Sequence, residues 1–485
     1  MIDQHTHSNI HTFTNTQYSS NSSTPALDEP TISSQASPRT GQGARGKLEK
    51  PVSAAQSHRG ASEPSGLAPL PADRPRPTAH GWVYRVAIFS DSERANRAVG
   101  ATGCGVSLAS VDFDRFDASV YSRRMAAVAA ATADAGLDAL VITPGSDLCY
   151  LVGLRAQTFE RLTALVLPAS GDPTIVVPRL ELASLTGSAV AELVLPVRDW
   201  VDGDDPYMLV SAVLGGGILA TAVTDSMPAL HLLPLADAFG KLPVLATDVL
   251  RGLRMVKEAC EIDVLRMAGA AIDRVHARVP EFLAPGRTEA DVAADIAEAI
   301  VAEGHSEVAF VIVGSGPHGA DPHHCYSARE LRAGDIVVVD IGGVYGPGYH
   351  SDCTRTYSIG DPEPEVAQHF SVLKRAQRAA FDAVRPGVTA KQVDAVARDV
   401  LADAGLAEYF VHRTGHGIGL SVHEEPYIVA GNDLQLTPGM AFSIEPGIYF
   451  PGRWGARIED IVVVTEDGAL AVNNRPRELI VVPAS

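Results

Sequence analysis

The sequence predicts an N-terminal α/β domain followed by an α+β domain that contains an internal repeat. The chain has 485 residues, which is too long for one ordinary hydrophobic core. Strand-like and helix-like segments alternate over residues 111–250, and two similar stretches recur within residues 251–485. Residues 1–110, which are rich in Ser, Thr, Pro and Gly, are predicted to form a disordered low-complexity extension.

The composition of the chain limits the classes of partner that the protein could bind. The formal net charge of -19 argues against nucleic acid, because its phosphates would be repelled. The five cysteines are scattered and form no CxxC pair, which is typical of a protein from a reducing compartment. No signal peptide and no apolar run of ~20 residues is visible. We therefore expect a cytoplasmic protein that binds neither nucleic acid nor membranes.

The first domain shows regular α/β patterning and no catalytic motif. Residues 116–136 read as an amphipathic helix that ends at Gly136. The apolar stretch LDALVITPG follows as a buried strand, and RLTALVLPASGDPTIVVPRLE reads as a hairpin that turns at Gly171. A long helix over residues 255–283 is expected to lead into the second domain.

The second domain carries a weak duplication. PGRTEADVAADIAEAIVAEG begins at Pro285, and PGVTAKQVDAVARDVLADAG begins at Pro386. In each stretch a threonine, Thr288 or Thr389, is placed to cap a helix that ends at glycine. The two halves of the domain are therefore predicted to be related by a pseudo-twofold axis.

Matched carboxylates follow the two helices. LRAGDIVVVD ends at Asp340, and LTPGMAFSIE ends at Glu445; in both, the acid comes nine positions after the leucine and is expected to end a buried strand. Asp352 and Glu459 follow these acids by 12 and 14 residues, after glycine-rich turns. Each half thus predicts a β-hairpin with one acid on each strand. Four converging acids would repel one another, and a pair of divalent cations removes that conflict.

Histidines accompany the acids. His416 lies among three nearby glycines in RTGHGIGL and is a candidate metal ligand. His423 and His323 precede Glu445 and Asp340 by 22 and 17 residues and are expected to face each other across the site. His318, in GSGPHGA, is interpreted as a loop residue that could compete for a ligand role.

In their order, these motifs resemble the pita-bread metallohydrolase family of prolidases, Xaa-Pro aminopeptidases, methionine aminopeptidases and creatinase. The resemblance rests on VVVDIGG, GYHSDCTRTYSIG, RTGHGIGL, HEEPY, SIEPGIY and ARIEDIVVV, and it extends over residues 112–483. The N-terminal α/β domain resembles the creatinase-type domain, which favours the prolidase and Xaa-Pro aminopeptidase branch. The strongest likeness is to actinobacterial Xaa-Pro dipeptidases.

The resemblance implies a role for each site residue. Asp340 would bind one metal, His416 and Glu445 the other, and Asp352 and Glu459 would bridge the two. A water between the metals would attack the peptide carbonyl as hydroxide, with Glu445 taking its proton. His323 and His423 would stabilise the intermediate or the leaving group, and Arg457 would orient a ligand carboxylate.

The same resemblance implies a homodimer that cleaves small peptides containing proline, with Mn or Co favoured and Zn or Fe also compatible with the ligands. The leading interpretation is an Xaa-Pro dipeptidase. An Xaa-Pro aminopeptidase for longer peptides, an amide hydrolase or lyase of non-peptidic substrates, and a catalytically dead scaffold are the alternatives. Tyr427 stands where many prolidases have a substrate-binding arginine. Cys325 and Cys353 are interpreted as small neutral spacers, with a redox-sensitive site as the alternative.

Overall fold

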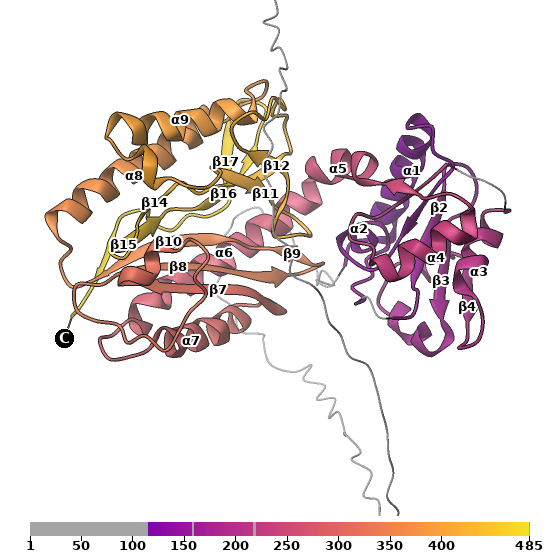
Figure 1. Cartoon of the computed structure of the whole chain (residues 1–485), viewed down its shortest axis with the longest axis horizontal. Coiled ribbons are helices and arrows are strands. Elements are labelled where there is room, and N and C mark those ends of the chain that lie inside the picture. The colour runs from indigo at the N-terminus through magenta and orange to yellow at the C-terminus, as the bar shows by residue number, and fades with distance from the viewer. Residues whose placement is uncertain (1–114, 158–159, 217–219, 485) are drawn as a thin grey trace, which may run out of the picture. The chain divides into compact units, whose positions relative to one another are not determined.

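The computed structural model describes residues 115–157, 160–216 and 220–484 (Figure 1). The predicted disordered extension, residues 1–110, lies outside the described residues. Within the described part of the chain, no helix is long and apolar enough to cross a membrane.

The N-terminal domain contains a six-stranded mixed sheet in the order β4-β3-β2-β1-β5-β6 (Figure 1). Helices accompany the sheet, and α1 begins after Asp117, whose carboxylate accepts a hydrogen bond from Ser119 N. The bounds are β1 Ala139–Ile142, β2 Ala164–Pro168, β3 Thr174–Pro178, β4 Val197–Trp200, β5 Thr221–Val223, β6 Val244–Leu245, α1 Ala118–Asp134, α2 Ser146–Val152, the 3-10 helix η1 Arg179–Leu185, α3 Pro206–Val213, α4 Ala229–Phe239 and α5 Thr247–Met255.

The buried strand and the hairpin that were predicted from the sequence lie at the centre of this sheet. All four residues of β1 are buried, and β1 pairs antiparallel with β2 and parallel with β5. Strands β2 and β3 form the predicted antiparallel hairpin. Gly171 lies in its turn with φ 120°, a conformation that favours glycine.

The expected long helix is shorter at its start than predicted. The helix α6 begins at Ala259 rather than near residue 255, because Val256 pairs with Met440 and the Lys257 N–H donates to Gly439 O at 2.9 Å. These contacts keep the two residues extended. The side chains of Glu258 and Glu261 then form a capping box that starts the helix.

The second domain consists of two similar halves (Figure 1). Thr288 and Thr389 both form capping boxes, as predicted, at the starts of α7 and α9. Both threonines also form an isolated bridge, Thr288 with Glu330 before β8 and Thr389 with Gln435 before β13. The bounds are α6 Ala259–Phe282, α7 Glu289–Ala302, β7 Glu307–Ser315, the 3-10 helix η2 Gly316–Ala320, β8 Ile336–Tyr345, β9 Tyr349–His350, β10 Cys353–Ile359, α8 Pro364–Ala383, α9 Ala390–Asp403, η3 Ala407–Tyr409, β11 Gly415–Gly417, β12 Glu424–Ile428, β13 Ala441–Ile444, β14 Gly447–Phe450, β15 Trp454–Arg457, β16 Asp460–Val464, β17 Ala469–Ala471 and β18 Ile480–Val482.

Each half packs a pair of helices against its own sheet. One sheet has the order β18-β10-β8-β7 with β9 beside β8, and the other has the order β12-β11-β13-β16-β17. One apolar core joins α6 and α7 to the first sheet, and a second core joins α8 and α9 to the other. In Figure 1 the helix pairs lie outside and the sheets lie between them. This arrangement brings strand ends from both halves to one place.

The positions of the acids correct one detail of the predicted hairpins. Asp340 does not end its strand, because β8 continues to Tyr345. Gly342 permits this continuation, since a Cβ there would lie 2.4 Å from both the Phe310 ring and Ser351 O. Asp340 is paired with Thr354, so it is not opposite Asp352.

Candidate metal centre

Five predicted ligands come together between the two sheets. Asp340 lies within β8, and Asp352 directly precedes β10. His416 is the middle residue of β11, Glu445 directly follows β13, and Glu459 directly precedes β16. Four of the residues are buried, and the Glu445 side chain is 14% exposed. Both halves of the repeat therefore contribute to one polar cluster in an apolar interior.

His416 presents one ring nitrogen to the acids. Its Nε2 lies 3.3 Å from Glu445 Oε1, 3.7 Å from Asp352 Oδ2 and 4.0 Å from Glu459 Oε1. Its Nδ1 lies 3.1 Å from the Gly417 carbonyl oxygen, an acceptor that fixes the proton on Nδ1. The Nε2 lone pair is then free to bind a metal.

The glycines around His416 are required by close packing. A Cβ on Gly415 would lie 1.8 Å from Ser443 O, and one on Gly417 would lie 2.2 Å from Glu425 O. The backbone of β11 therefore runs against its neighbours closer than any side chain would permit. This close packing of the backbone explains why glycines surround His416 in the sequence.

Polar neighbours orient the carboxylates. Arg457 Nη2 donates to Asp340 Oδ2 at 2.7 Å, and Thr354 Oγ1 donates to Glu459 Oε2 at 2.7 Å. The remaining oxygens of the cluster are not all satisfied. Among the described residues, Asp340 Oδ1 and Asp352 Oδ1 are buried and accept no hydrogen bond. Unpaired buried carboxylate oxygens are costly, and a cation provides the missing partner.

The pKa values of the cluster also indicate a site for cations. Burial, together with the neighbouring acids, raises the pKa of Asp352 and that of Glu459 well above their usual values. Burial raises the pKa of Glu445 to about 7 and lowers the pKa of His416 to about 3. Four acids and one neutral imidazole in a dry site suit divalent cations, which favour oxygen ligands with a nitrogen donor. The residues present therefore fit a metal centre.

We predict that the metal-stripped protein loses stability with rising pH through Glu445. Its pKa is raised from 4.5 to about 7 on folding, so the folded state binds more protons between these values and stability falls as pH rises. The difference in unfolding free energy between metal-stripped Glu445→Gln and metal-stripped wild type should rise by about 3 kcal/mol at most from pH 4.5 to pH 8. Urea unfolding at both pH values measures this gain. An equal difference in stability between the two proteins at both pH values would contradict the prediction.

The other two predicted histidines lie at the edge of the cluster. The His423 ring is perpendicular to the His416 ring, with 4.2 Å between centroids. His323 is exposed and lies close enough for its charge to lower the pKa values of His412 and His423. Arg457 Nη1 lies 3.3 Å from Pro322 O, beside His323. His318 points elsewhere and contacts Glu289 rather than the four acids and His416.

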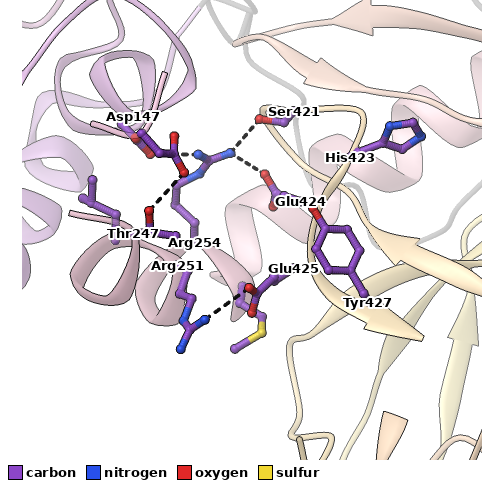
Figure 2. Close-up of a pocket in the computed structure, with 12 residues that line it drawn as sticks. Asp147, Thr247, Arg251, Arg254, Ser421, His423, Glu424, Glu425 and Tyr427 are labelled. Carbon is purple, nitrogen blue, oxygen red and sulfur yellow. Dashed lines mark hydrogen bonds and ion pairs between the residues drawn. The ribbon is translucent and has the colours of Figure 1, made fainter. Parts of the chain in front are cut away.

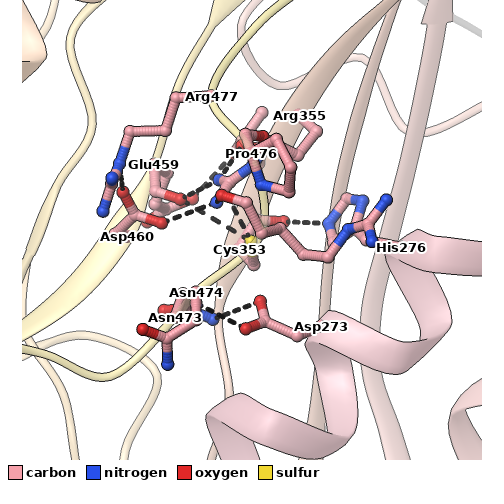
Figure 3. A network of polar contacts seen from close by, with 12 residues as sticks. Asp273, His276, Cys353, Arg355, Glu459, Asp460, Asn473, Asn474, Pro476 and Arg477 are labelled. Carbon is pink, nitrogen blue, oxygen red and sulfur yellow. Dashed lines mark hydrogen bonds and ion pairs between the residues drawn. The ribbon is translucent and has the colours of Figure 1, made fainter. Parts of the chain in front are cut away.

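Cys353 shows no sign of redox chemistry. Its thiol is buried between Arg355 and the Glu459 main chain, and burial raises its pKa well above the usual value (Figure 3). A thiol with a raised pKa forms little reactive thiolate. Its surroundings agree with the predicted neutral spacer. Cys325 is exposed and lies beside His323.

Sequence reasoning missed a pocket beside His423 (Figure 2). It has a volume of about 200 Å³ and is lined by both domains. Glu424, the residue after His423, pairs with Arg254 and with Lys257 Nζ, the latter at 2.5 Å. Arg254 Nη1 also donates to Asp147 Oδ1 at 2.8 Å. These ion pairs fix the histidine segment, and only their scattered charges were visible in the sequence.

Sequence reasoning also missed Arg413, which lies beside the same segment. Its guanidinium lies 4.5 Å from the centroid of the Tyr427 ring, in a cation–π contact. Its charge contributes to lowering the pKa values of His416 and His423. Among the described acids, none forms an ion pair with Arg413. The signal was the arginine three residues before His416.

A buried cluster of acids and histidine between two related halves, on this fold, defines a metal-dependent hydrolase. Residues 263–466 match metallopeptidase family M24, and residues 124–256 match the creatinase/prolidase N-terminal domain. The chain belongs to metallopeptidase family M24. The predicted fold class, family and enzyme class are thereby confirmed.

Individual relatives agree. The probable dipeptidase PepE of Mycobacterium tuberculosis strain H37Rv is 83% identical over 371 residues, which are 76% of this chain and 99% of that protein. An Xaa-Pro dipeptidase of Lactobacillus helveticus is 34% identical over 72% of this chain and 96% of its own. The crystal structure of dipeptidase PepE from Mycobacterium ulcerans is 81% identical, with a TM-score of 0.74 over 76% of this chain and all of the other.

Proposed function

We propose that this metallopeptidase hydrolyses the bond before proline in Xaa-Pro dipeptides, using two divalent cations. The observation that carries the proposal is the buried cluster, in which ligand atoms of Asp352, His416 and Glu459 lie within 4.8 Å of one another and one oxygen each of Asp340 and Asp352 lacks a partner among the described residues. The relatives named dipeptidase and Xaa-Pro dipeptidase support the choice of substrate. The oxygen-rich ligands favour Mn or Co over metals that prefer thiolates.

In this proposal Asp340 would hold one metal, His416 and Glu445 would hold the second, and Asp352 and Glu459 would contribute to both. Two bound cations would lower the pKa of a water and polarise the scissile carbonyl. Glu445 accepts the proton of the attacking water. Arg457 keeps Asp340 oriented through their 2.7 Å contact.

The two edge histidines act on the substrate. His423 and His323 would donate to the oxygen that becomes negative in the tetrahedral intermediate, or to the departing proline nitrogen. Burial lowers the pKa of His423, so it is neutral near pH 7 and donates a single N–H. The Arg254 and Lys257 contacts to Glu424 limit the movement of His423 during this step.

Arg413 is proposed to bind the carboxylate of a dipeptide. The cation expected at position 427 is replaced by Tyr427, and the Arg413 guanidinium stacks on that ring. A guanidinium that has no partner among the described acids and is held by an aromatic face suits recognition of a carboxylate. This arrangement favours dipeptides, whose C-terminal carboxylate belongs to the proline itself.

We predict that Arg413→Met raises KM for Ala-Pro by about 10- to 100-fold, the cost of losing a charge-assisted hydrogen bond. Hydrolysis of Ala-Pro-Ala should change much less, because its carboxylate lies one residue further away. Steady-state kinetics on both peptides measure the ratio. Arg251→Met, the same change at an arginine that lines the pocket and pairs with Glu425, is the matched control. An equal loss on both peptides would contradict carboxylate binding by Arg413.

The direct test of the proposed function uses metal-stripped protein reconstituted with Mn or Co. The reconstituted protein should cleave Ala-Pro, cleave Ala-Pro-Ala more slowly, and leave Ala-Ala nearly intact. Elemental analysis should find two metals per chain. If neither proline peptide is cut after reconstitution, the proposal is wrong. If Ala-Pro-Ala is the better substrate, the enzyme is an aminopeptidase instead.

We also propose that the protein is cytoplasmic and forms a homodimer. The four described cysteines, Cys149, Cys260, Cys325 and Cys353, are free, as we expect for the cytoplasm. The predicted homodimer can be checked by light scattering after size-exclusion chromatography. A mass of 51 kDa rather than twice that value would contradict the dimer.

A further inference from the structure

Glu289 is a buried acid outside the proposed metal centre. It is the first residue of α7, and its side chain is fully buried. Its Oε1 accepts from Ser315 N at 2.8 Å and from Ser315 Oγ at 2.6 Å. Its Oε2 accepts from His324 Nε2 at 2.8 Å and from Ser327 Oγ at 2.7 Å. His318 Nδ1 lies 3.1 Å from both oxygens.

These donors surround one short segment. Ser315 and His318 lie before His323 in the chain, while His324 and Ser327 lie after it. His323 itself is exposed and makes no contact with Glu289. A single carboxylate thus ties down both sides of the segment that presents His323 to the cleft. Such contacts would reduce the entropy lost when the histidine is oriented.

The carboxylate is stable in its charged form. Burial alone raises the pKa of Glu289, but the hydrogen bonds from Ser315, His324 and Ser327 outweigh burial and lower it to about 2. The free N–H groups at the start of α7 also favour a negative charge there. Glu289 is therefore a charged acceptor throughout the pH range in which a peptidase works.

The second half of the repeat uses a buried acid in a similar way, although at another helix position, since Ala390 is the counterpart of Glu289. Asp394, in α9, is buried, and its Oδ1 accepts from Thr414 Oγ1 at 2.8 Å and Thr414 N at 3.2 Å. Thr414 lies two residues before His416. The helices α7 and α9 are counterparts in the repeat. Each half therefore uses a buried acid near the start of its helix to fix a segment that carries a site histidine.

A cation site is the competing explanation for Glu289. One ligand atom each from Glu289, His318 and His324 lies within 4.8 Å of the others. However, both Glu289 oxygens already accept hydrogen bonds from two serines as well as from the histidines. This leaves no orphaned oxygen, in contrast to Asp340 and Asp352. The contacts favour a hydrogen-bonded anchor over a third metal.

We infer that Glu289 is a positioning residue that holds His323 in place for its step in catalysis, through the His324 and Ser327 hydrogen bonds. The inference rests on the proposed function, because His323 has its role only there. It extends the requirement for activity to a residue that contacts neither substrate nor metal in the proposal.

The test is a double-mutant cycle of Glu289→Gln and His323→Ala in the metal-loaded enzyme. Glu289→Gln alone should lower kcat by about 10- to 100-fold, with KM changed by less than about twofold. In the His323→Ala background it should cost almost nothing, because both changes remove one function. Multiplicative losses would overturn the inference. Glu261→Gln, which alters another buried first-turn glutamate, should leave kcat near wild type.

A second pair of variants separates positioning from folding. His324→Gln keeps an N–H near Glu289 and should retain most activity, whereas His324→Leu should resemble Glu289→Gln. Equal activities in the two variants would contradict the anchor. After loading with Zn or Mn, elemental analysis should find the same number of metals per chain in wild type and in His324→Leu, without a third metal in wild type. Finding one would overturn the anchor in favour of a cation site.

Hydrogen–deuterium exchange gives a readout that does not depend on the substrate. Exchange of residues 316–327 should rise in Glu289→Gln and remain unchanged in Glu261→Gln. If exchange rises but no proline peptide is cut by wild type, the proposed function fails while the anchoring contact stands. If proline peptides are cut and exchange does not rise, the inference about Glu289 fails alone.

Discussion

Replacing Glu459 by alanine is expected to reduce hydrolysis of Ala-Pro on the order of 10³-fold or more and to remove bound metal. Glu459 lies between the halves, with Oε1 4.0 Å from His416 Nε2 and Oε2 accepting from Thr354 at 2.7 Å. As a proposed bridge, it serves both cations, so its loss affects each of them. Asp352→Ala should have the same effect for the same reason.

The metal count is the decisive measurement for these variants. Elemental analysis and kinetics should show both losses together, while circular dichroism should show a folded protein. Glu365→Ala, which removes an exposed acid paired with Arg453, is the control and should keep both metals. A bridging variant that retains two metals and near-normal turnover would refute the bridging assignment.

Replacing Arg355 by methionine is expected to cost at least about 3 kcal/mol of stability, the lower end for breaking a buried ion pair. Arg355 is 1% exposed and Asp460 is fully buried, and they lie 2.7 Å apart (Figure 3). Arg355 Nη1 also donates to Glu459 O at 2.6 Å. The substitution therefore leaves a buried acid undercompensated and loosens the backbone of a proposed ligand.

Urea unfolding of the Arg355 variant measures the cost directly. Arg375→Met, the same change at an exposed arginine on α8, should alter stability by less than about 0.5 kcal/mol. Asp460 keeps its contacts with Gln377 and Arg477, so complete unfolding is not expected. A loss of less than 1 kcal/mol would show that these two partners suffice.

The repeat explains why so much was predictable from the sequence. Thr288 and Thr389 are local capping signals, and acids at the ends of apolar runs are visible without a structure. The glycines around His416 also reported close packing correctly. These signals involve residues that are close together in the chain, so they can be recognised from the sequence alone. The five predicted ligands lie at one place because each is fixed to a strand by such a signal.

Other features depend on contacts between distant residues. Glu289 resembles any helix-starting glutamate until Ser315, His324 and Ser327 are seen around it. The contact between Arg413 and Tyr427 joins segments whose pairing the sequence does not state. The extent of β8 beyond Asp340 was also missed, because glycine pairs usually indicate turns rather than strands.

The division of the ligands between two separate sheets has a consequence for how the molecule unfolds. Asp340 and Asp352 belong to one half, while His416, Glu445 and Glu459 belong to the other. Each half has its own apolar core, while a further apolar cluster, the pairing of β18 with β10 and the Arg355–Asp460 ion pair join the halves without a metal. Binding at the shared centre would add its free energy only when both are intact. The metal-loaded protein would then unfold at a higher temperature than the metal-depleted protein.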